Sequence, residues 1–394
     1  MHRLFNRTVW LVAFISLLTD ISSEMLYPIM PFYLQSIGFS ALLIGLLEGL
    51  AEALAGLSKG TFGQLSDARG ARVAFVRLGY GLSSLSKPLL ALSPAITWVF
   101  GARLLDRLGK GIRTSPRDAL LSAQATPETK GRVFGLHRGM DTLGAALGPV
   151  AALAWLAWRP GDYRTLFLLA FGPALLGVAL TFLLKDPPAA KPAQSAARPR
   201  VPLLGYLAYW KQASPAYRRL VGGLLAFTLC NSSDAFLLLR AREQGQPELW
   251  ILGIYICYNL IYALASLPAG ALADRFGMRR TLELGLLLFA AVYAGFAFGV
   301  NFIGLLTLFG LYALYAACSE SIAKAWIAKI TPAHETGTAI GLFVSLASLA
   351  TLIASSLAGL LWQLGFPGLP FGVSALGALA VLGWFHFAAG QLPD

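Results

Sequence analysis

The stretch GQLSDARGAR at residues 63–72 is matched by GALADRFGMR at residues 270–279, 207 positions later. Two shorter pairs have nearly the same offset: SSE and SSD (22–24 and 232–234), and TP twice (126–127 and 331–332). Matches at a nearly constant offset are typical of an internal duplication. The chain is therefore predicted to consist of two related halves.

The composition is that of a membrane protein. Of the 394 residues, 57% are hydrophobic and 13% are charged, whereas a soluble domain carries about 25% charged residues. The net charge of +12 comes from basic residues in short loops between apolar runs, so it does not indicate nucleic-acid binding. Cys230, Cys257 and Cys318 lie within apolar runs and lack metal-ligand spacing.

Twelve apolar runs have the roughly 20 residues that a membrane span requires. We expect spans at about 8–35, 40–64, 73–92, 95–122, 131–158, 163–184, 216–240, 249–271, 280–300, 303–327, 336–362 and 367–389. The longest break, KDPPAAKPAQSAARPRVP at 185–202, has the composition of a solvated linker. We therefore predict an N-terminal bundle (1–184), a linker (185–215) and a C-terminal bundle (216–394).

The loops predict the orientation. The basic residues on one side are Arg3, Arg7, Arg69, Arg72, Lys130, Arg132, the series from Lys185 to Arg219, Arg275 to Arg280, and Lys329. The opposite loops hold fewer, namely Arg159, Arg164, Arg240 and Arg242. Because basic loops stay in the cytoplasm, we expect a multi-pass protein of the cell (inner) membrane with both termini and the linker cytoplasmic.

The repeated stretch resembles the Gly-x-x-x-Asp-Arg-x-Gly-Arg-Arg signature of the major facilitator superfamily. Gly63, Asp67, Gly70 and Arg72 fit it, while Ala68 and Ala71 depart from it; the second copy fits through Gly270, Asp274, Arg275, Gly277, Arg279 and Arg280. The resemblance implies an all-α fold of twelve transmembrane helices in two pseudo-symmetric six-helix bundles. It also implies a conformational latch made by Gly63, Asp67, Arg72, Gly270, Asp274 and Arg275.

Two further motifs support the resemblance. RLGKG at 107–111 is similar to the fourth-helix pattern Arg-x-x-Gln-Gly, with Lys110 in place of Gln. GLHRGMDTLGAALGP resembles the helix-five pattern of the family's antiporters through Gly135, Gly144, Gly148 and Pro149, but lacks its closing Gly-Gly. That pattern occurs mainly in exporters. The same glycines also fit a purely structural role in helix packing.

Charged residues recur at helical spacing inside these runs. Asp20, Ser23, Glu24, Tyr27 and Pro31 share one face of the first span, because residues 3, 4 and 7 apart are neighbours on a helix. The other charged faces are Glu48, Glu52 and Lys59; Arg103, Asp106, Arg107, Lys110, Arg113, Arg117 and Asp118; and His137, Arg138 and Asp141. A charge near the bilayer centre costs about 2.5–3.5 kcal/mol, so these faces are expected to line an aqueous or ion-paired interior.

Two interpretations of these faces remain open. Arg113, Arg117, Asp118, Lys110, Arg132 and Lys59 also fit a structural role, in which ion pairs lock helices together. For substrate binding or ion coupling we select Asp20, Glu24, Glu48, Glu52, Arg103, Arg107, Asp141, Asn231, Asp234, Tyr258 and Asn259. Asp20 and Glu24 are adjacent carboxyls, so one of them is a candidate proton carrier.

No catalytic constellation and no nucleotide-binding loop is present in the sequence, so we expect neither an enzyme nor a primary pump. The sequence predicts a proton-coupled secondary transporter that exports a small organic or drug-like solute. The alternatives are a transporter of an organic or phosphorylated anion and, less favoured, a transition-metal exporter. We expect a monomer that needs no cofactor beyond its coupling ion, H⁺ or Na⁺. Its partners are a small-molecule substrate and membrane lipid, with no nucleic acid.

Overall fold

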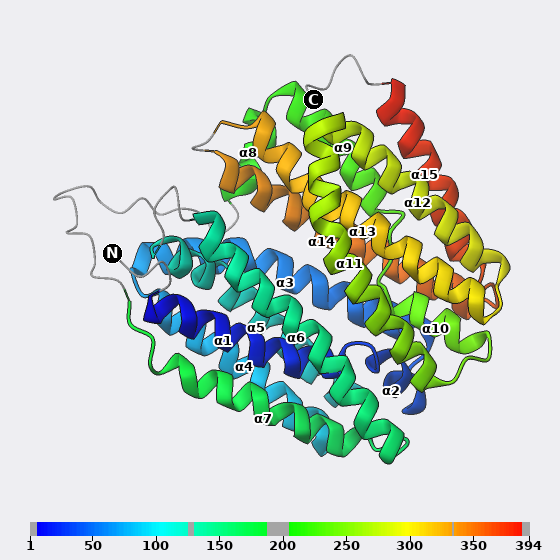
Figure 1. The fold of residues 1–394 in the computed structure, drawn as a ribbon, viewed down its shortest axis with the longest axis horizontal. Coiled ribbons are helices and arrows are strands. Elements are labelled where there is room, and N and C mark those ends of the chain that lie inside the picture. Colours follow the sequence, from blue (N-terminus) through cyan, green and yellow to red (C-terminus); the bar gives the residue numbers. More distant parts are fainter. Residues whose placement is uncertain (1–5, 125–129, 187–204, 333–334, 388–394) are drawn as a thin grey trace. The chain divides into compact units, whose positions relative to one another are not determined.

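A computed structural model describes residues 6–124, 130–186, 205–332 and 335–387 (Figure 1). These residues form helices and contain no strand. The helices are α1 (Arg7–Leu26), α2 (Met30–Ser36), α3 (Ala41–Arg69), α4 (Arg72–Leu92), α5 (Ile96–Ser122), α6 (Lys130–Trp158), α7 (Tyr163–Thr181), η1 (Gly205–Ala208), α8 (Tyr209–Gln212), α9 (Pro215–Thr228), α10 (Ala235–Glu243), α11 (Glu248–Phe276), α12 (Met278–Phe298), α13 (Phe302–Ile330), α14 (Thr336–Gln363) and α15 (Leu369–Phe387).

Each predicted span falls on helical structure, but two of them are broken. The first span divides into α1 and α2 around Pro28, because proline has no backbone N–H to donate and its ring crowds the carbonyl one turn earlier. The seventh span divides into α9 and α10 at residues 229–234, where the sequence LCNSSD offers polar side chains that compete with the helix backbone. Expecting one continuous helix in each place was therefore wrong.

Nine of the helices in the described ranges are long and apolar enough to cross a membrane. The helices α9 and α10 are individually too short for this, and α5 carries a dense stripe of charge. The fold is that of a multi-pass helical membrane protein. The count of twelve spans stays a prediction.

The chain divides into two compact units. Unit 1 comprises residues 1–27 and 54–205, and unit 2 comprises residues 28–53 and 206–394. Residues 28–53 thus group with the C-terminal helices, although the sequence places them in the N-terminal bundle. Most of the predicted linker, residues 187–204, lies outside the described residues.

In unit 1, helices α1 and α4–α7 lie side by side (Figure 1). Lipid is as apolar as the helix surfaces, so close packing rather than hydrophobic burial must hold these helices together. Glycines allow that packing: a Cβ at Gly109 of α5 would lie 2.5 Å from the carbonyl oxygen of Gly79 in α4. An apolar cluster that includes Val12, Val76 and Leu120 fills the space between the helices.

In unit 2, α12 packs against α13 and α15, and α11 packs against α13. Glycines also explain why residues 28–53 belong here. A Cβ at Gly49 would lie 2.7 Å from the Cα of Leu352 in α14, and Gly45 approaches the backbone of Ser355 even more closely. The segment is further held by Arg242 of α10, whose guanidinium stacks 5.2 Å from the ring centre of Phe32.

Candidate substrate pocket

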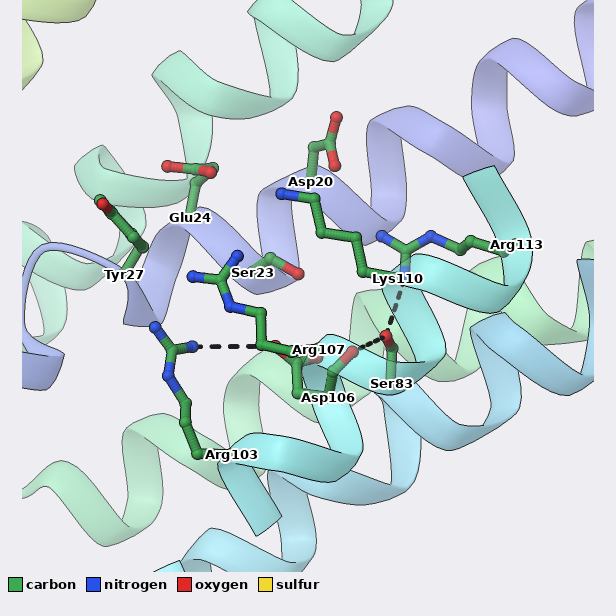
Figure 2. Close-up of a pocket in the computed structure, with 10 residues that line it drawn as sticks. All are labelled: Asp20, Ser23, Glu24, Tyr27, Ser83, Arg103, Asp106, Arg107, Lys110 and Arg113. Carbon is green, nitrogen blue, oxygen red and sulfur yellow. Dashed lines mark hydrogen bonds and ion pairs between the residues drawn. The ribbon is translucent and has the colours of Figure 1, made fainter. Parts of the chain in front are cut away.

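A pocket in unit 1 is lined by side chains from α1, α4 and α5 (Figure 2). Its lining residues are Asp20, Ser23, Glu24, Tyr27, Ser83, Arg103, Asp106, Arg107, Lys110 and Arg113. Figure 2 shows Arg107 and Lys110 reaching from α5 toward the side of the pocket formed by α1. The α1 side carries Asp20 and Glu24, and all four basic side chains of the lining come from α5.

The polar face of α1 is a direct result of residue spacing. Asp20, Ser23, Glu24 and Tyr27 are three or four residues apart, so they share one face of the helix. Tyr27 ends this face, and its ring lies 5.8 Å from the guanidinium carbon of Arg107. Contact of this kind between a cation and an aromatic face is favourable and helps to orient the guanidinium.

The charged stripe of α5 is largely buried. Arg103, Arg107 and Arg113 are each only 5% exposed. Such burial requires compensating partners, since an isolated buried charge is very costly. Arg113 has two: it donates to the Ser83 hydroxyl at 2.7 Å, and its guanidinium carbon lies 4.5 Å from the ring centre of Tyr80.

A buried ion pair joins α4 to this stripe. The ammonium of Lys87 donates to Asp106 Oδ1 at 2.7 Å and to the carbonyl oxygen of Ser83 at 2.8 Å. The Lys87 side chain is 2% exposed, and Asp106 is 15% exposed. Arg103 Nη1 lies 3.7 Å from the other carboxylate oxygen of Asp106. Lys87 therefore neutralises the one acid that α5 contributes to the pocket.

The balance of charge in the pocket is positive. Its lining contains four basic side chains, Arg103, Arg107, Lys110 and Arg113, against the three acids Asp20, Glu24 and Asp106. Because Lys87 already neutralises Asp106, the remaining pocket carboxylates that can balance the four α5 cations are Asp20 and Glu24 of α1. A site with these groups is suited to a solute that carries an anionic group.

Asp141 of α6 does not line this pocket but lies beside it. Its Oδ2 atom is 3.4 Å from His137 Nδ1, and its side chain is 15% exposed. His137 Nε2 lies 2.8 Å from the Ser16 hydroxyl, and Arg117 donates to that hydroxyl at 3.1 Å. Arg117 in turn pairs with the neighbouring Asp118 at 2.9 Å. A buried polar network therefore runs between α1, α5 and α6.

The other predicted cavity residues lie in unit 2. Tyr312 donates to Asp234 Oδ1 at 2.6 Å. Asn231 donates to the Tyr315 hydroxyl at 3.0 Å and accepts from the Tyr293 hydroxyl at 3.2 Å. Glu48 is buried and Glu52 is half-buried. The ring of Tyr258 stacks on those of Tyr262 and Tyr312. The Asn259 side chain donates to the Tyr255 carbonyl oxygen of its own helix. The described part of unit 2 thus presents a tyrosine-rich hydrogen-bonded cluster instead of a basic face.

The loop-motif glycines shape two helix junctions. Gly70 and Gly277 have φ values of +65° and +95°, the left-handed region that glycine adopts without strain. They join α3 to α4 and α11 to α12. Two of the predicted latch residues contact α5: Gly63 packs on Ser115, and Arg72 donates to the carbonyl oxygen of Ala119. In the second copy, the Arg275 guanidinium lies over the Phe276 ring, and Gly270 has open space around it. The side chains of Asp67 and Asp274 lie outside the described residues.

The helix-five motif lies in α6, where α6 crosses α1. A Cβ at Gly144 would lie 2.8 Å from the Asp20 Cβ, and one at Gly148 would lie 2.7 Å from the Ile21 carbonyl oxygen. Pro149 lies within the same helix, while the surroundings of Gly135 are outside the described residues. Gly144 and Gly148 therefore set the distance between α1 and α6.

Sequence reasoning missed Lys87, Ser83, Ser16 and Tyr80. Lys87 had a signal, because it is a lone charge in the apolar part of its span, in SSLSKPLL. The other three are ordinary residues for a helix and give no signal by themselves. Within the described ranges, no group of three or more His, Cys, Asp or Glu side chains is placed to hold a metal ion.

The multi-pass helical fold and the charged internal pocket are typical of a membrane transporter. The sequence model of the Major Facilitator Superfamily matches residues 12–246 and 249–391, so the chain belongs to that family. An uncharacterized MFS-type transporter of Methanocaldococcus jannaschii is 33% identical over 368 residues, 92% of this chain and 90% of that protein.

Two further similarities are informative. The multi-drug resistance efflux pump PmrA of Streptococcus pneumoniae serotype 4 is 26% identical over 286 residues, 70% of this chain and 68% of that protein. The crystal structure of the human organic anion transporter MFSD10 aligns with a TM-score of 0.70 at 20% identity, covering 96% of this chain and 99% of that one. The structural likeness confirms the predicted fold.

Proposed function

We propose that this protein is a proton-coupled secondary transporter that exports a small organic solute bearing a carboxylate or phosphate group. The observation that carries the proposal is the pocket of unit 1, with four basic side chains facing two α1 carboxylates. An anion recruited by Arg107 and Lys110 would gain charge-assisted hydrogen bonds, which are about twice as strong as neutral ones.

The direction of transport is supported by relatives. PmrA is a multi-drug resistance efflux pump, and the helix-five pattern of this chain resembles that of antiporters. The basic pocket favours solutes with an anionic group over the cationic compounds that a purely acidic site would select.

Proton coupling is supported by the α1 acids beside the basic stripe. A carboxylate of α1 can either pair with Arg107 or Lys110, or take up a proton and release these cations to the solute. Proton binding and solute binding are then linked through one set of charges, which is the requirement for coupled transport. We place the protein in the cell membrane, with both termini in the cytoplasm, from the distribution of basic loops.

The test begins with a thermal-shift screen of the purified protein against carboxylates, phosphate esters, cationic drugs and divalent metals. Proteoliposomes with an imposed pH gradient are then loaded with the compounds that stabilise the protein. We expect stabilisation by anionic compounds and flux that depends on the gradient. Stabilisation by cationic drugs or metals alone, or flux that ignores the gradient, contradicts the proposal.

A variant links the result to the pocket. Arg107→Gln removes a cation that lines the pocket, and a hydrogen bond to a charged group contributes about 1.5–3 kcal/mol. We expect the apparent affinity for the anionic compound to fall about 10- to 100-fold. The matched control is Arg159→Gln, which changes an exposed arginine at the end of α6 and is expected to leave the affinity unchanged.

A further inference from the structure

A close approach between α1 and α6 brings two acids together. Helix α6 can lie against α1 only because Gly144 and Gly148 have no side chain; a Cβ on Gly144 would lie 2.9 Å from the Leu17 carbonyl oxygen and 2.8 Å from the Asp20 Cβ. Asp141 is one helical turn before Gly144 on α6 and therefore faces the same part of α1. The carboxyl groups of Asp141 and Asp20 lie within hydrogen-bonding reach of each other.

One oxygen of Asp141 lacks a donor. Its Oδ1 atom is buried and has no hydrogen-bond partner among the described residues. Leaving a buried acceptor unsatisfied costs about 1–3 kcal/mol, and more when the group is charged. A proton on one of the two carboxyls removes this cost, because the resulting O–H of Asp141 can donate to the carboxylate of Asp20.

The other oxygen of Asp141 is held by an ordered network. Arg117 can only donate, so the Ser16 hydroxyl accepts from it at 3.1 Å and is free to donate its own hydrogen to His137 Nε2 at 2.8 Å. That tautomer leaves the hydrogen of His137 on Nδ1, facing Asp141 Oδ2 at 3.4 Å. Tyr80 completes the network 3.2 Å from the same serine oxygen. A neutral His137 thus orients Asp141.

We propose that Asp20 and Asp141 share a single proton, and that this proton is the one exchanged for the solute. The inference rests on the proposed proton coupling and names its site, which differs from the Asp20 and Glu24 pair predicted by the sequence. Two carboxylates in contact repel each other, and one shared proton turns that contact into an O–H···O hydrogen bond.

The surrounding charges are consistent with one shared proton. Besides Asp20 on α1, the charged groups that face Asp141 are Arg117 on α5 and Arg138 on its own helix, with Asp118 paired to Arg117. The remaining neighbour, α7, contains a single charged residue, Arg164, near its start. Arg117 and Arg138, together with Lys110 on the Asp20 side (Figure 2), partly offset the two carboxylates, which leaves the pair able to bind and release one proton.

In the transport cycle, the Asp20–Asp141 pair gains one proton and later loses one proton. On one side of the membrane, the pair takes a proton from water at the Asp20 side, which lines the pocket, and forms one carboxylic acid hydrogen-bonded to one carboxylate. On the other side the acid returns the proton to water, and both carboxylates turn to the neighbouring cations. The glycines of the helix-five motif matter for coupling because they set the distance between the two acids.

The pair is tested by infrared difference spectroscopy of the reconstituted protein, with protons as the only ligand. Spectra are compared between about pH 5 and about pH 8, where an ordinary exposed carboxyl has already lost its proton. We expect the wild type to lose a protonated-carboxyl stretch that shifts in heavy water. Asp141→Asn and Asp20→Asn should each abolish that band, while Asp162→Asn, at the N-terminus of α7 outside the network, should retain it.

A second pair of variants tests the role of the glycine. Gly144→Ala forces α1 and α6 apart, so the band should weaken, whereas Gly139→Ala on the same helix meets no atom within 4 Å and should leave it unchanged. Wild-type elution on size exclusion serves as the check that each variant folds. A full-sized band in Asp141→Asn, or equal bands in the two alanine variants, overturns the shared proton.

The same variants separate this inference from the proposed function. If wild-type flux ignores the pH gradient, the proposed coupling itself fails. If wild-type flux follows the gradient and Asp141→Asn flux still does, the coupling stands and the assignment of its site is wrong. The expected result is that Asp141→Asn still exchanges solute for solute but has lost at least about 10-fold of its gradient-driven flux.

Discussion

Replacing Lys87 by methionine tests the buried ion pair beneath the pocket. Methionine has a similar length and no charge, so Lys87→Met removes the ammonium that lies 2.7 Å from Asp106 while nearly preserving the packing. The Asp106 carboxylate then remains in the interior, with Arg103 Nη1 still 3.7 Å away.

The expected loss follows from this geometry. Removing one partner of a buried ion pair costs about 3–5 kcal/mol, because the other charge is left uncompensated. The lower end applies here, since Arg103 offers partial compensation and Asp106 is 15% exposed. We therefore expect Lys87→Met to lower the free energy of unfolding by about 3 kcal/mol. The double variant Lys87→Met, Asp106→Asn removes both charges and should lose less than either single variant.

Unfolding in mixed micelles of mild detergent and SDS, followed by tryptophan fluorescence, measures these differences. The matched control is Lys211→Met, the same substitution at an exposed lysine of α8, which should change stability by less than about 0.5 kcal/mol. If the double variant loses as much as the two single variants together, Lys87 and Asp106 act independently and the reasoning fails.

Two further predictions concern helix packing and a contact near the linker. Gly109→Ala places a Cβ 2.5 Å from the Gly79 carbonyl oxygen and should destabilise the protein by about 1–3 kcal/mol in the same micelle assay. The control Gly101→Ala meets no atom within 4 Å and should be neutral or stabilising. Equal effects of the two substitutions would contradict the packing argument. Tyr209 donates to Glu335 at 3.0 Å, and burial together with that carboxylate raises the pKa of Tyr209. The contribution of Tyr209 to stability is therefore complete below the ordinary tyrosine pKa of about 10 and is lost as the pH rises through the higher pKa of the folded state. The protection factor of the α8 amides in hydrogen exchange, which corrects for the base-catalysed intrinsic rate, should therefore fall above about pH 10, and Tyr209→Phe should remove that fall.

Helical periodicity allowed much of unit 1 to be predicted. The spacing of Asp20, Glu24 and Tyr27 places them on one face, because residues three and four apart meet on any helix. The same argument predicted the α5 stripe, and both faces line the pocket. The cost of charge in a bilayer then required these faces to point toward protein or water.

Contacts between helices were not predictable in this way. Periodicity states which residues share a face but not which helix that face meets. Ser16 and His137 are 121 positions apart, and the pairing of Lys87 with Asp106 depends on how α4 and α5 cross. The crossing is decided by glycines that leave room for a neighbouring backbone, as at Gly79 and Gly109.

The sequence by itself thus determined the helical membrane class and the polar faces of α1 and α5, and it predicts two duplicated halves. The tertiary structure decided that residues 28–53 group with the C-terminal helices, and that the helix-five glycines bring Asp141 beside Asp20. The physical reason is that side-chain spacing is a property of one helix. The meeting of two acids from α1 and α6 is a property of the backbone distance between helices, which only their packing fixes.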